Sequence, residues 1–421
     1  MILIIFTHSY PYDFAAEQTF ISREIHHLIK NFDRVVLVPR ICRGKKFAFP
    51  ATVEVDESYA AFLKRNSGLP QLLKLAFRSS QFYKEIQKNT TVLLHPSKIL
   101  KLIMFSGRAN LTTQWLMDWL KKQQINATEC MLYSYWLDHL AAGLGMVKQE
   151  FPAVKVVSRA HGYDIFEEYY YPYYWPYRYE TLESIDRLFL ASEAGKKYFC
   201  EHYPDFVSKY EIAHLGTSDP GFVAQSSKDK VFRIVSCSGI VPVKRIDLLL
   251  DGLAVMARLL PGQKFEWVHF GDGRDKWRLE RKVKQIFPSN INGRFLGYMP
   301  NHEILRYYRE YPVDVFVNVS ETEGGAPVAI QEAVSCGVPI VATSVGGNPE
   351  IVSAKNGILL PPSPTPEEIA WALLKIWDNP LSAAKMRRES RQIWQTRFNA
   401  DVNFHWFAER LKSIRQERKV K

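Results

Sequence analysis

The sequence predicts an α/β protein built from two doubly wound domains. Short apolar runs rich in β-branched residues alternate with helical stretches, and this alternation occurs once in each half of the 421-residue chain. Such alternation is typical of a parallel sheet with helices on both faces. A content of 47% hydrophobic and 24% charged residues indicates a globular protein, and the length suits two domains of ordinary size.

The first half contains six predicted strands. They are the opening ILIIF, residues 34–39, 130–136, 154–160 and 187–192, and a last run within 210–216. The opening apolar run is short and has no basic residues before it, so we expect a first strand and not a signal peptide. Since no later stretch approaches about 18 uninterrupted apolar residues, we expect no membrane span. We place the N-terminal domain at residues 1–217.

A polar segment at 218–230 separates the two halves and is the predicted linker. Five predicted strands follow, at 231–239, 264–271, 293–298, 313–319 and 338–343. They define a C-terminal domain at residues 231–384. Residues 385–421 are amphipathic, aromatic and strongly basic, and predict terminal helices.

The most specific motif is SETEGGAPVAIQEAVSCGVPIVATSVGGNPEIV, at 320–352. Gly324 and Gly325 allow a tight turn after a buried strand, and Pro327 suits the start of a helix at 328–336. Ala326 lies between them. The helix start would therefore lie at the carboxyl end of the sheet, where its free N–H groups and positive dipole end favour a diphosphate.

Two carboxylates flank this predicted anion site, Glu323 before the glycines and Glu332 within the helix. A carboxylate can accept two hydrogen bonds from a vicinal diol, so one can bind a sugar and the other a ribose. Taken singly, each glutamate could also be an ordinary solvated residue. Their combination with the glycines, including Gly346 and Gly347, favours the functional reading.

This segment resembles the donor-site signature of the retaining GT-B glycosyltransferases of family 4. That signature reads E-G-x₆-E-A followed by C-G-x-P-V-x-A-x₃-G-G-x-x-E-I, whereas eight residues separate Glu323 from Glu332 here. Either the loop is one residue longer, or Glu323 is displaced from the usual position. The resemblance implies the GT-B fold: two Rossmann-like domains facing a cleft, with the C-terminal helices crossing back onto the first domain.

Further motifs resemble those of the same family. SCSGIVPVKRIDLLLDGL places Lys244 as the partner of the donor diphosphate, and a lysine at a helix start is otherwise disfavoured by the dipole. Many relatives have an arginine at the position of Gly239, and the neighbouring Arg245 is a candidate substitute. The stretches FGDG and FLGYM resemble a glycine turn and the segment that contacts the base.

The resemblance implies three sets of site residues. The implied catalytic residues are His161, in SRAHGYDIFEE, together with Glu323 and Lys244. The implied donor-binding residues are Gly239, Lys244, Arg245, Gly271, Gly297, Tyr298, Glu323, Gly324, Gly325, Ala326, Pro327 and Glu332. The implied acceptor-side residues are Glu17 and Asp164, in the N-terminal domain. A lone histidine is more often structural, so His161 has that second interpretation as well.

No D-x-D motif stands at a strand end, so we expect no metal and no other cofactor, with the leaving diphosphate stabilised by Lys244 and helix N-termini. The five cysteines form no C-x-x-C pair, which favours a cytoplasmic protein. The net charge of +11 suits an anionic membrane surface or a diphosphate-linked acceptor. We expect no nucleic-acid partner, because no recognised binding motif is present.

The sequence thus predicts an enzyme: a retaining transferase that moves a sugar from a nucleotide sugar to a glycan or lipid-linked acceptor, as in polysaccharide or lipopolysaccharide biosynthesis. We place it in the cytoplasm, with peripheral contact at the inner face of the membrane. Two alternatives are a non-catalytic sugar-nucleotide-binding scaffold subunit and another GT-B enzyme, such as a nucleotide-sugar epimerase.

Overall fold

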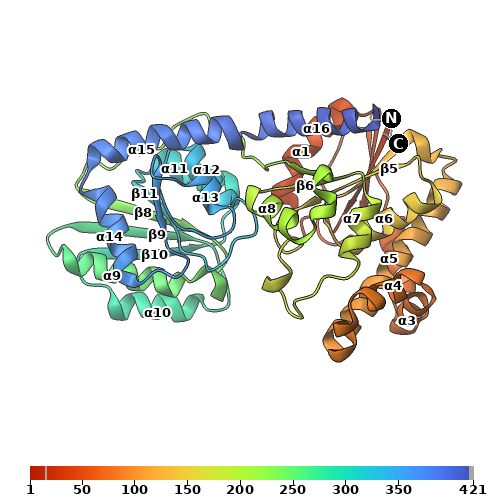
Figure 1. The fold of residues 1–421 in the computed structure, drawn as a ribbon. Helices are drawn as coiled ribbons and strands as arrows, with labels where there is room; N and C mark the ends of the chain where they lie inside the picture. Colours follow the sequence, from red (N-terminus) through yellow and green to blue (C-terminus); the bar gives the residue numbers. More distant parts are fainter. Residues whose placement is uncertain (15–16, 417–421) are drawn as a thin grey trace. The chain divides into compact units, whose positions relative to one another are not determined.

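The computed structural model describes residues 1–14 and 17–416, which form two compact units (Figure 1). Unit 1 comprises Met1–Ala213 together with the chain from Phe404 onward, and unit 2 comprises His214–Asn403. Each unit contains a wholly parallel sheet with helices on its faces. The predicted α/β class with two doubly wound domains is confirmed.

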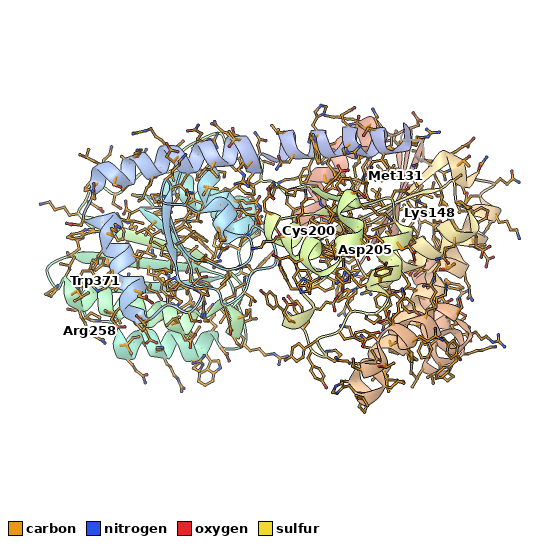
Figure 2. The ribbon with its side chains drawn as sticks, in the orientation of Figure 1. Met131, Lys148, Cys200, Asp205, Arg258 and Trp371 are labelled. Carbon is orange, nitrogen blue, oxygen red and sulfur yellow. The ribbon has the colours of Figure 1, made fainter. Side chains whose placement is uncertain are left out.

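Unit 1 has a seven-stranded sheet in the order β3-β2-β1-β4-β5-β6-β7. Its strands are β1 (Ile2–Thr7), β2 (Arg34–Pro39), β3 (Val53–Val55), β4 (Cys130–Ser134), β5 (Lys155–Ala160), β6 (Arg187–Leu190) and β7 (Tyr210–Ile212). The strand side chains alternate between two hydrophobic cores, one on each face of the sheet. Met131 of β4, for example, is buried in the second of these cores (Figure 2).

The helices of unit 1 include a long central helix, α5, against which α3 and α6 pack. They are α1 (Glu17–Asn31), α2 (Ser58–Asn66), α3 (Leu69–Arg78), α4 (Ser80–Lys88), α5 (Pro96–Lys122), α6 (His139–Glu150), α7 (Arg178–Ser184) and α8 (Glu193–His202).

Unit 2 has a six-stranded sheet in the order β10-β9-β8-β11-β12-β13. Its strands are β8 (Val231–Cys237), β9 (Lys264–Phe270), β10 (Ile291–Gly297), β11 (Val315–Asn318), β12 (Ile340–Thr343) and β13 (Gly357–Leu360). Its helices are α9 (Ile246–Leu259), α10 (Lys276–Ile286), α11 (Asn301–Glu310), α12 (Val328–Ser335), α13 (Asn348–Ile351), α14 (Pro366–Trp377) and α15 (Pro380–Ile393). Trp371 of α14 is largely exposed on the surface of this unit (Figure 2).

Both sheets reverse their strand order at one point, between β1 and β4 in unit 1 and between β8 and β11 in unit 2. At such a switch point the loops that follow the two strands diverge and leave a crevice at the carboxyl edge of the sheet. The loops after β1 and β4, and those after β8 and β11, are therefore where a ligand is expected.

The segment predicted as a linker, 218–230, contains no helix or strand and lies within unit 2. It is fixed there, because Ala224 N donates to Cys336 O at 2.9 Å and Ser227 Oγ donates to Asp314 at 2.6 Å. The chain changes unit at Ala213, and returns to unit 1 at Phe404 within the last helix, α16 (Ala400–Gln416). Residues 417–421 of the predicted terminal helices lie outside the described residues.

Among the described helices, none is both long enough and apolar enough to cross a lipid bilayer.

Candidate functional site

Opposite charges meet at the switch point of unit 2. Lys244 follows β8, Glu323 follows β11, and Lys244 Nζ lies 2.6 Å from Glu323 Oε1. Asn318 at the end of β11 donates to the same oxygen at 3.1 Å. Both charged side chains are mostly shielded from solvent. The lysine ammonium has three donors, of which this ion pair uses one.

The loop that carries Glu323 lies directly against the loop after β12. Gly346 has φ +50°, and a Cβ at this position would overlap the carbonyl oxygen of Glu323. A Cβ at Gly347 would overlap the backbone of Gly325 and Ala326. Gly346 and Gly347 therefore pack directly against the loop that contains Gly324 and Gly325, and this close approach requires glycine.

Gly324 to Pro327 lead into α12, whose predicted position is confirmed to within one residue. Pro327 precedes the helix, and no side chain of the described residues caps it. Gln331 Nε2 donates to Ala326 O at 2.9 Å and holds the loop against the helix. The first N–H groups of α12 thus remain at the carboxyl edge of the sheet, where they can bind an anion.

Glu332 is 4% exposed and accepts a hydrogen bond from Asn301 Nδ2 at 2.7 Å. Burial, and then the negative charge of Glu332, raise the pKa of the nearby Cys237 thiol to about 12, while Lys244 acts in the opposite direction. Glu332 and Lys244 therefore both lie close to the end of β8. Glu323 and Glu332 are both largely shielded from solvent, so neither is the ordinary solvated glutamate that the sequence also allowed.

Arg245 lies beside Lys244 but its guanidinium is directed to backbone. Its Nε donates to Val319 O at 2.8 Å, and its Nη2 donates to Ser320 O at 2.8 Å and Pro362 O at 2.7 Å. Arg245 thus braces the loop that carries Glu323. Gly239 is exposed.

The glycine turn after β9 contacts the end of β10. Gly271 N donates to Gly297 O at 2.8 Å, and a Cβ at Gly271 would overlap the carbonyl oxygen of Ser238. Tyr298, next in the chain, is 79% exposed. These residues lie on the β9 side of the switch point, beside the loop that follows β8.

Glu17 in unit 1 is buried and holds backbone, which differs from its predicted acceptor-side position. Its two oxygens accept from the N–H groups of His8 at 2.9 Å, Ser9 at 2.7 Å and Tyr10 at 2.8 Å, and from Trp136 Nε1 at 2.6 Å. Only 3% of the residue is exposed. The carboxylate satisfies the N–H groups of the loop after β1, so it shapes that loop.

Asp164, the other predicted acceptor-side residue, is completely buried. It accepts from the N–H groups of His161 at 2.8 Å, Gly162 at 3.0 Å and Leu137 at 3.0 Å. These bonds tie the loop after β5 to the loop after β4. Because a buried residue with this set of donors has no surface to offer an acceptor, its role is to fix the position of His161.

His161 lies between two rings, 4.7 Å from the ring centroid of Tyr135 and 4.5 Å from that of Trp136. Burial, followed by the charges of Arg159 and His8, lowers its pKa well below the usual range. The imidazole is therefore neutral at physiological pH. A neutral, aromatic-lined histidine fits either a packing role or a hydrogen bond to an uncharged ligand.

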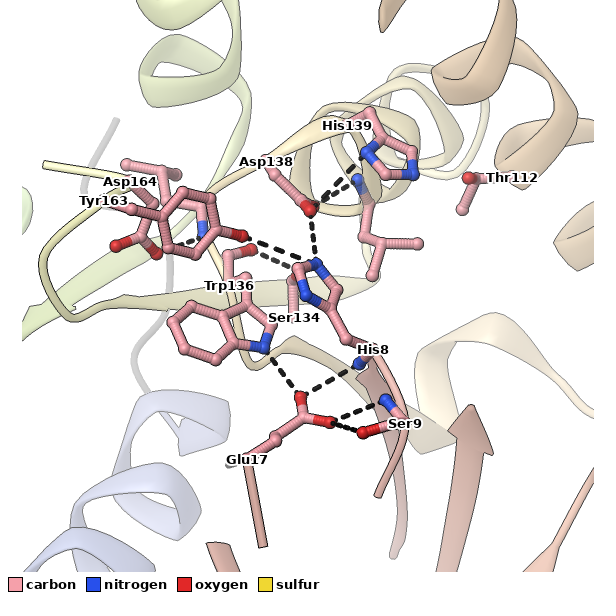
Figure 3. Close-up of polar contacts among 12 residues, drawn as sticks. His8, Ser9, Glu17, Thr112, Ser134, Trp136, Asp138, His139, Tyr163 and Asp164 are labelled. Carbon is pink, nitrogen blue, oxygen red and sulfur yellow. Dashed lines mark hydrogen bonds and ion pairs between the residues drawn. The ribbon is translucent and has the colours of Figure 1, made fainter. Parts of the chain in front are cut away.

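A polar cluster that the sequence analysis missed lies at the switch point of unit 1 (Figure 3). His8 follows β1 directly, and its Nε2 lies 2.7 Å from Asp138 Oδ2, after β4. Tyr163 Oη lies 3.4 Å from the same nitrogen, and the ring of Trp136 stacks on that of His8 at 5.3 Å. One available signal was a histidine immediately after the first buried strand.

Asp138 is held rigidly, because its other oxygen accepts from Leu140 N at 2.8 Å at the start of α6. Burial would raise the pKa of Asp138, but the adjacent His139 and His8 lower it below its ordinary value. A charged carboxylate therefore orients the His8 ring. Among the described residues, no group of three or more His, Cys, Asp or Glu side chains is arranged to hold a metal ion.

Residues 221–393 match the model of the family described as glycosyl transferases group 1. This range covers every candidate residue of unit 2 and excludes those of unit 1.

Among curated proteins, the chain is similar to the GtfA subunit of a UDP-N-acetylglucosamine–peptide N-acetylglucosaminyltransferase from Streptococcus agalactiae. The two are 22% identical over 193 residues, 45% of this chain and 36% of that protein. It is also similar to the amylovoran biosynthesis glycosyltransferase AmsK of Erwinia amylovora, 24% identical over 188 residues, 43% of this chain and 45% of that protein. The chain thus spans less than half the length of these relatives.

Several solved structures cover nearly the whole chain, among them the following two. One is the lipopolysaccharide outer core galactosyltransferase WaaB, with a TM-score of 0.69, 14% identity, and coverage of 98% of this chain and 99% of that one. The other is Anabaena HepE in complex with UDP, with a TM-score of 0.63, 17% identity and the same coverage. At this identity the likeness shows the fold, and the predicted GT-B architecture is the one these structures share.

Proposed function

We propose that the protein is a retaining glycosyltransferase of GT-B family 4, which moves a sugar from a nucleotide-sugar donor to a glycan or lipid-linked acceptor in surface polysaccharide or lipopolysaccharide biosynthesis. The observation that carries this proposal is the Lys244–Glu323 pair at the unit 2 switch point, beside the start of α12. It lies within the segment that matches the glycosyl transferases group 1 model.

The donor would bind along this edge with its diphosphate at the first N–H groups of α12. Lys244 supplies a positive charge there, and two of its three donors remain available. Glu332 and Glu323 can each accept two hydroxyl hydrogens, so we assign Glu332 to the ribose and Glu323 to the transferred sugar. UDP is the first nucleotide to test, since it is the ligand of the Anabaena HepE structure.

The reaction would depend on stabilising the departing diphosphate. The bond from the anomeric carbon to the diphosphate breaks, the acceptor hydroxyl bonds to the same face of that carbon, and its proton passes to the departing diphosphate. Lys244 and the α12 N-terminus would stabilise the charge that develops, with neither a metal nor another cofactor required. The resemblance also implies a catalytic role for His161, whose neutral ring can form a hydrogen bond to an uncharged ligand without adding a charge.

We test the donor site by thermal unfolding with UDP, GDP, ADP and their sugar conjugates. A nucleotide at a hundredfold excess over its dissociation constant should stabilise the wild type by about 2.7 kcal/mol. Lys244→Ala and Glu332→Ala should lose that effect. The matched control is Lys282→Ala, because Lys282 forms an ion pair of similar length with Asp251, at 2.7 Å, on α9 and α10.

Transfer to an acceptor extract, followed by NMR of the product anomer, tests the chemistry. A product with the donor's anomeric configuration supports retention, whereas an inverted product contradicts it. Nucleotide binding without any turnover would favour the scaffold-subunit alternative. If a nucleotide stabilises Lys244→Ala and Glu332→Ala as much as the wild type, the donor does not bind at this edge of the sheet.

We also propose peripheral contact with an anionic membrane at the cytoplasmic face, through the surface of α3, α4 and η1 (Thr90–Leu94). This surface exposes Leu69, Phe77, Tyr83, Leu93 and Leu94, each by 50% or more. Lys74, Arg78 and Lys84 are exposed on the same helices. Apolar side chains among basic ones are typical of helices that lie at a lipid surface.

Sedimentation with vesicles measures this contact. The wild type should bind vesicles that contain anionic phospholipid more strongly than neutral ones, and Phe77→Glu with Leu94→Glu should abolish binding. Leu381→Glu is the control, since Leu381 is an exposed leucine of unit 2. Equal binding of both variants would locate the membrane contact elsewhere.

A further inference from the structure

A hollow of about 650 Å³ opens in unit 1 beyond the end of β2. Several elements line it, and they contribute mainly cationic and small apolar side chains. Its principal lining residues are Arg40 and Ile41 after β2, Ala61 and Lys64 of α2, Arg108 of α5 and His139 of α6. None of these residues was singled out by the sequence motifs.

No described acidic side chain forms an ion pair with the cations of the hollow. Within the described part of the chain, the side chains of Arg40, Arg108 and Lys64 form no hydrogen bond or ion pair, and both arginines are partly buried. The one acidic residue of the lining, Glu57, is already paired, with Lys46 Nζ at 2.6 Å and Tyr12 Oη at 2.6 Å. Partly buried charges of one sign are costly without a counter-ion, so this set favours an anionic ligand.

Asp138 is the other carboxylate near the hollow, and its charge acts on both Arg40 and Arg108. Its oxygens accept from Leu140 N at 2.8 Å and contact His8 Nε2 at 2.7 Å. It forms no ion pair with Arg40 or Arg108 within the described residues. The hollow thus has two guanidinium groups and one ammonium group, whereas among the described residues Glu57 is already paired and Asp138 forms no ion pair with either arginine.

His139 gives a second, independent sign of a ligand. The residue is 5% exposed and lines the hollow, yet its Nε2 is buried without a hydrogen-bond partner among the described residues. Its Nδ1 lies 3.5 Å from Asp138 Oδ2. Burial, opposed by Asp138 and reinforced by Arg40 and Arg108, lowers the pKa of His139 to about 3. A buried polar atom without a protein partner needs an explanation, and a bound ligand or water is one.

We propose that this hollow binds a phosphate group of the acceptor, held by Arg40, Arg108 and Lys64. The Nε2 of the neutral His139 serves as an acceptor for a hydroxyl of the bound group. Guanidinium groups match the oxygens of a phosphate in pairs, and lysine adds a point charge. The apolar wall of Ile41, Ala61 and Leu63 suits the group that carries the phosphate. The assignment to an acceptor rests on the proposed function, whereas phosphate binding itself does not.

The position of Asp138 connects the hollow to the polar cluster at the unit 1 switch point. It contacts His139 on the side of the hollow and His8 on the side of the cluster (Figure 3). An acceptor anchored by its phosphate in the hollow would thus have its next groups beside His8 and Tyr163. Two sources share this chemistry: a lipid-linked diphosphate and a soluble sugar phosphate.

The test measures binding of inorganic phosphate by calorimetry to the full chain with saturating UDP, which occupies the donor edge. Arg40→Ala, Arg108→Gln and Lys64→Ala should each weaken binding at least tenfold. Arg65→Ala is the matched control, because Arg65 is exposed on the same helix and does not line the hollow. Circular dichroism and retained UDP stabilisation verify that each variant is folded. Wild-type affinity in the three hollow variants would overturn the proposal, as would absence of phosphate binding.

Competition identifies the source. Displacement of phosphate by vesicles that contain a polyprenyl diphosphate supports the lipid-linked acceptor, and displacement by a soluble sugar phosphate supports the other. Displacement by neither overturns the acceptor assignment. If the wild type does not bind UDP, the phosphate assay is repeated with Lys244→Ala, which removes the positive charge of the donor edge. Phosphate binding that persists in this variant would mean that the donor site is wrong and the phosphate site in the hollow is right.

Discussion

At the scale of single residues, the acidic side chains of the candidate sites divide into two kinds. Glu17 and Asp164 accept backbone N–H groups and are buried, whereas Glu323 faces a lysine at the edge of a sheet. A carboxylate has acceptors alone, so it is well suited to gather several N–H groups of one loop. The same residue type therefore builds the loop in unit 1 and presents charge in unit 2.

Glu17→Gln should destabilise the protein by about 3 kcal/mol, because the new NH₂ group would face N–H donors in either orientation and leave them unsatisfied. The urea midpoint of unfolding measures this loss. Glu129→Gln, at an exposed position, is the control and should leave the midpoint unchanged. An unaltered midpoint in Glu17→Gln would mean that the loop after β1 does not depend on the carboxylate.

His269 predicts a dependence of stability on pH. It is fully buried, its Nδ1 lies 2.9 Å from Ser236 Oγ and its Nε2 lies 3.1 Å from Ser238 O. Burial lowers its pKa to about 4, with the Ser238 carbonyl acting in the opposite direction. Since the unfolded chain binds a proton near pH 6.5 and the folded chain near pH 4, stability falls as pH decreases through that window.

For His269 alone the loss between pH 7 and pH 5 is about 2 kcal/mol. His269→Gln keeps a donor toward Ser238 and does not titrate, so it should lose correspondingly less stability over this interval than the wild type. Urea unfolding at pH 7 and pH 5 measures both losses. Parallel losses in the two proteins would show that His269 is protonated in the folded state, or that its proton has no effect on folding.

The unit 2 residues could be predicted because their spacing is local. Gly324 to Glu332 lie on one loop and one helix, and Lys244 follows the neighbouring strand of the same sheet. The contact between His8 and Asp138 could not be predicted from the sequence, since the two residues lie 130 positions apart and no short motif links them. The burial of Glu17 and Asp164 was likewise set by tertiary packing, which local pattern does not reveal.

At the scale of loops and elements, the edge of unit 2 depends on backbone fit. Gly346→Ala should weaken nucleotide binding at least tenfold, because its Cβ would displace the Glu323 loop and its φ of +50° is unfavourable for alanine. Gly262→Ala is the control: Gly262 is exposed and a Cβ there meets no atom of the described residues within 4 Å. A nucleotide titration with unchanged affinity in Gly346→Ala would contradict this account of the loop.

The loop after β8 offers a gain of function. Gly239 is exposed and a Cβ there meets no atom of the described residues within 4 Å, so the site tolerates a longer side chain. Gly239→Arg should tighten nucleoside diphosphate binding about tenfold, roughly 1.4 kcal/mol, because it adds a positive charge near the proposed diphosphate site. Arg245 does not supply this charge, since its guanidinium donates to backbone carbonyl groups. Titration with UDP, compared with Gly262→Arg, measures the effect. No difference between the variants would place Gly239 away from the diphosphate.

Most strands could be predicted from continuous apolar runs, and each of the eleven predicted runs overlaps a strand of the structure. Two strands were missed, β3 and β13, because each is short and the surrounding sequence has no strong period. The segment 218–230 looked like a free linker because it is polar. Its backbone bonds to unit 2, such as Ala224 N to Cys336 O, depend on residues more than a hundred positions away.

At the scale of the whole molecule, the last helix completes the core of unit 1. Phe404, Phe407, Leu411 and Ile414 of α16 are buried in unit 1, and Phe407 contacts the rings of Tyr133 and Phe189. The same ring lies 4.5 Å from the guanidinium carbon of Arg159, which is buried in an ion pair with Glu24. The N-terminal sheet therefore requires residues from the other end of the chain.

Phe407→Ala should destabilise unit 1 by about 3–5 kcal/mol, since it opens a cavity in a close-packed core and exposes the Arg159–Glu24 pair. Trp406→Ala, one residue earlier and 44% exposed, is the matched control. Hydrogen exchange followed by mass spectrometry measures each unit separately.

In Phe407→Ala the amides of β1, β4 and β5 should exchange faster while those of β8, β11 and β12 keep their protection. Equal acceleration in both units would indicate that the two sheets unfold together, and protection unchanged in unit 1 would mean that α16 is not part of its core.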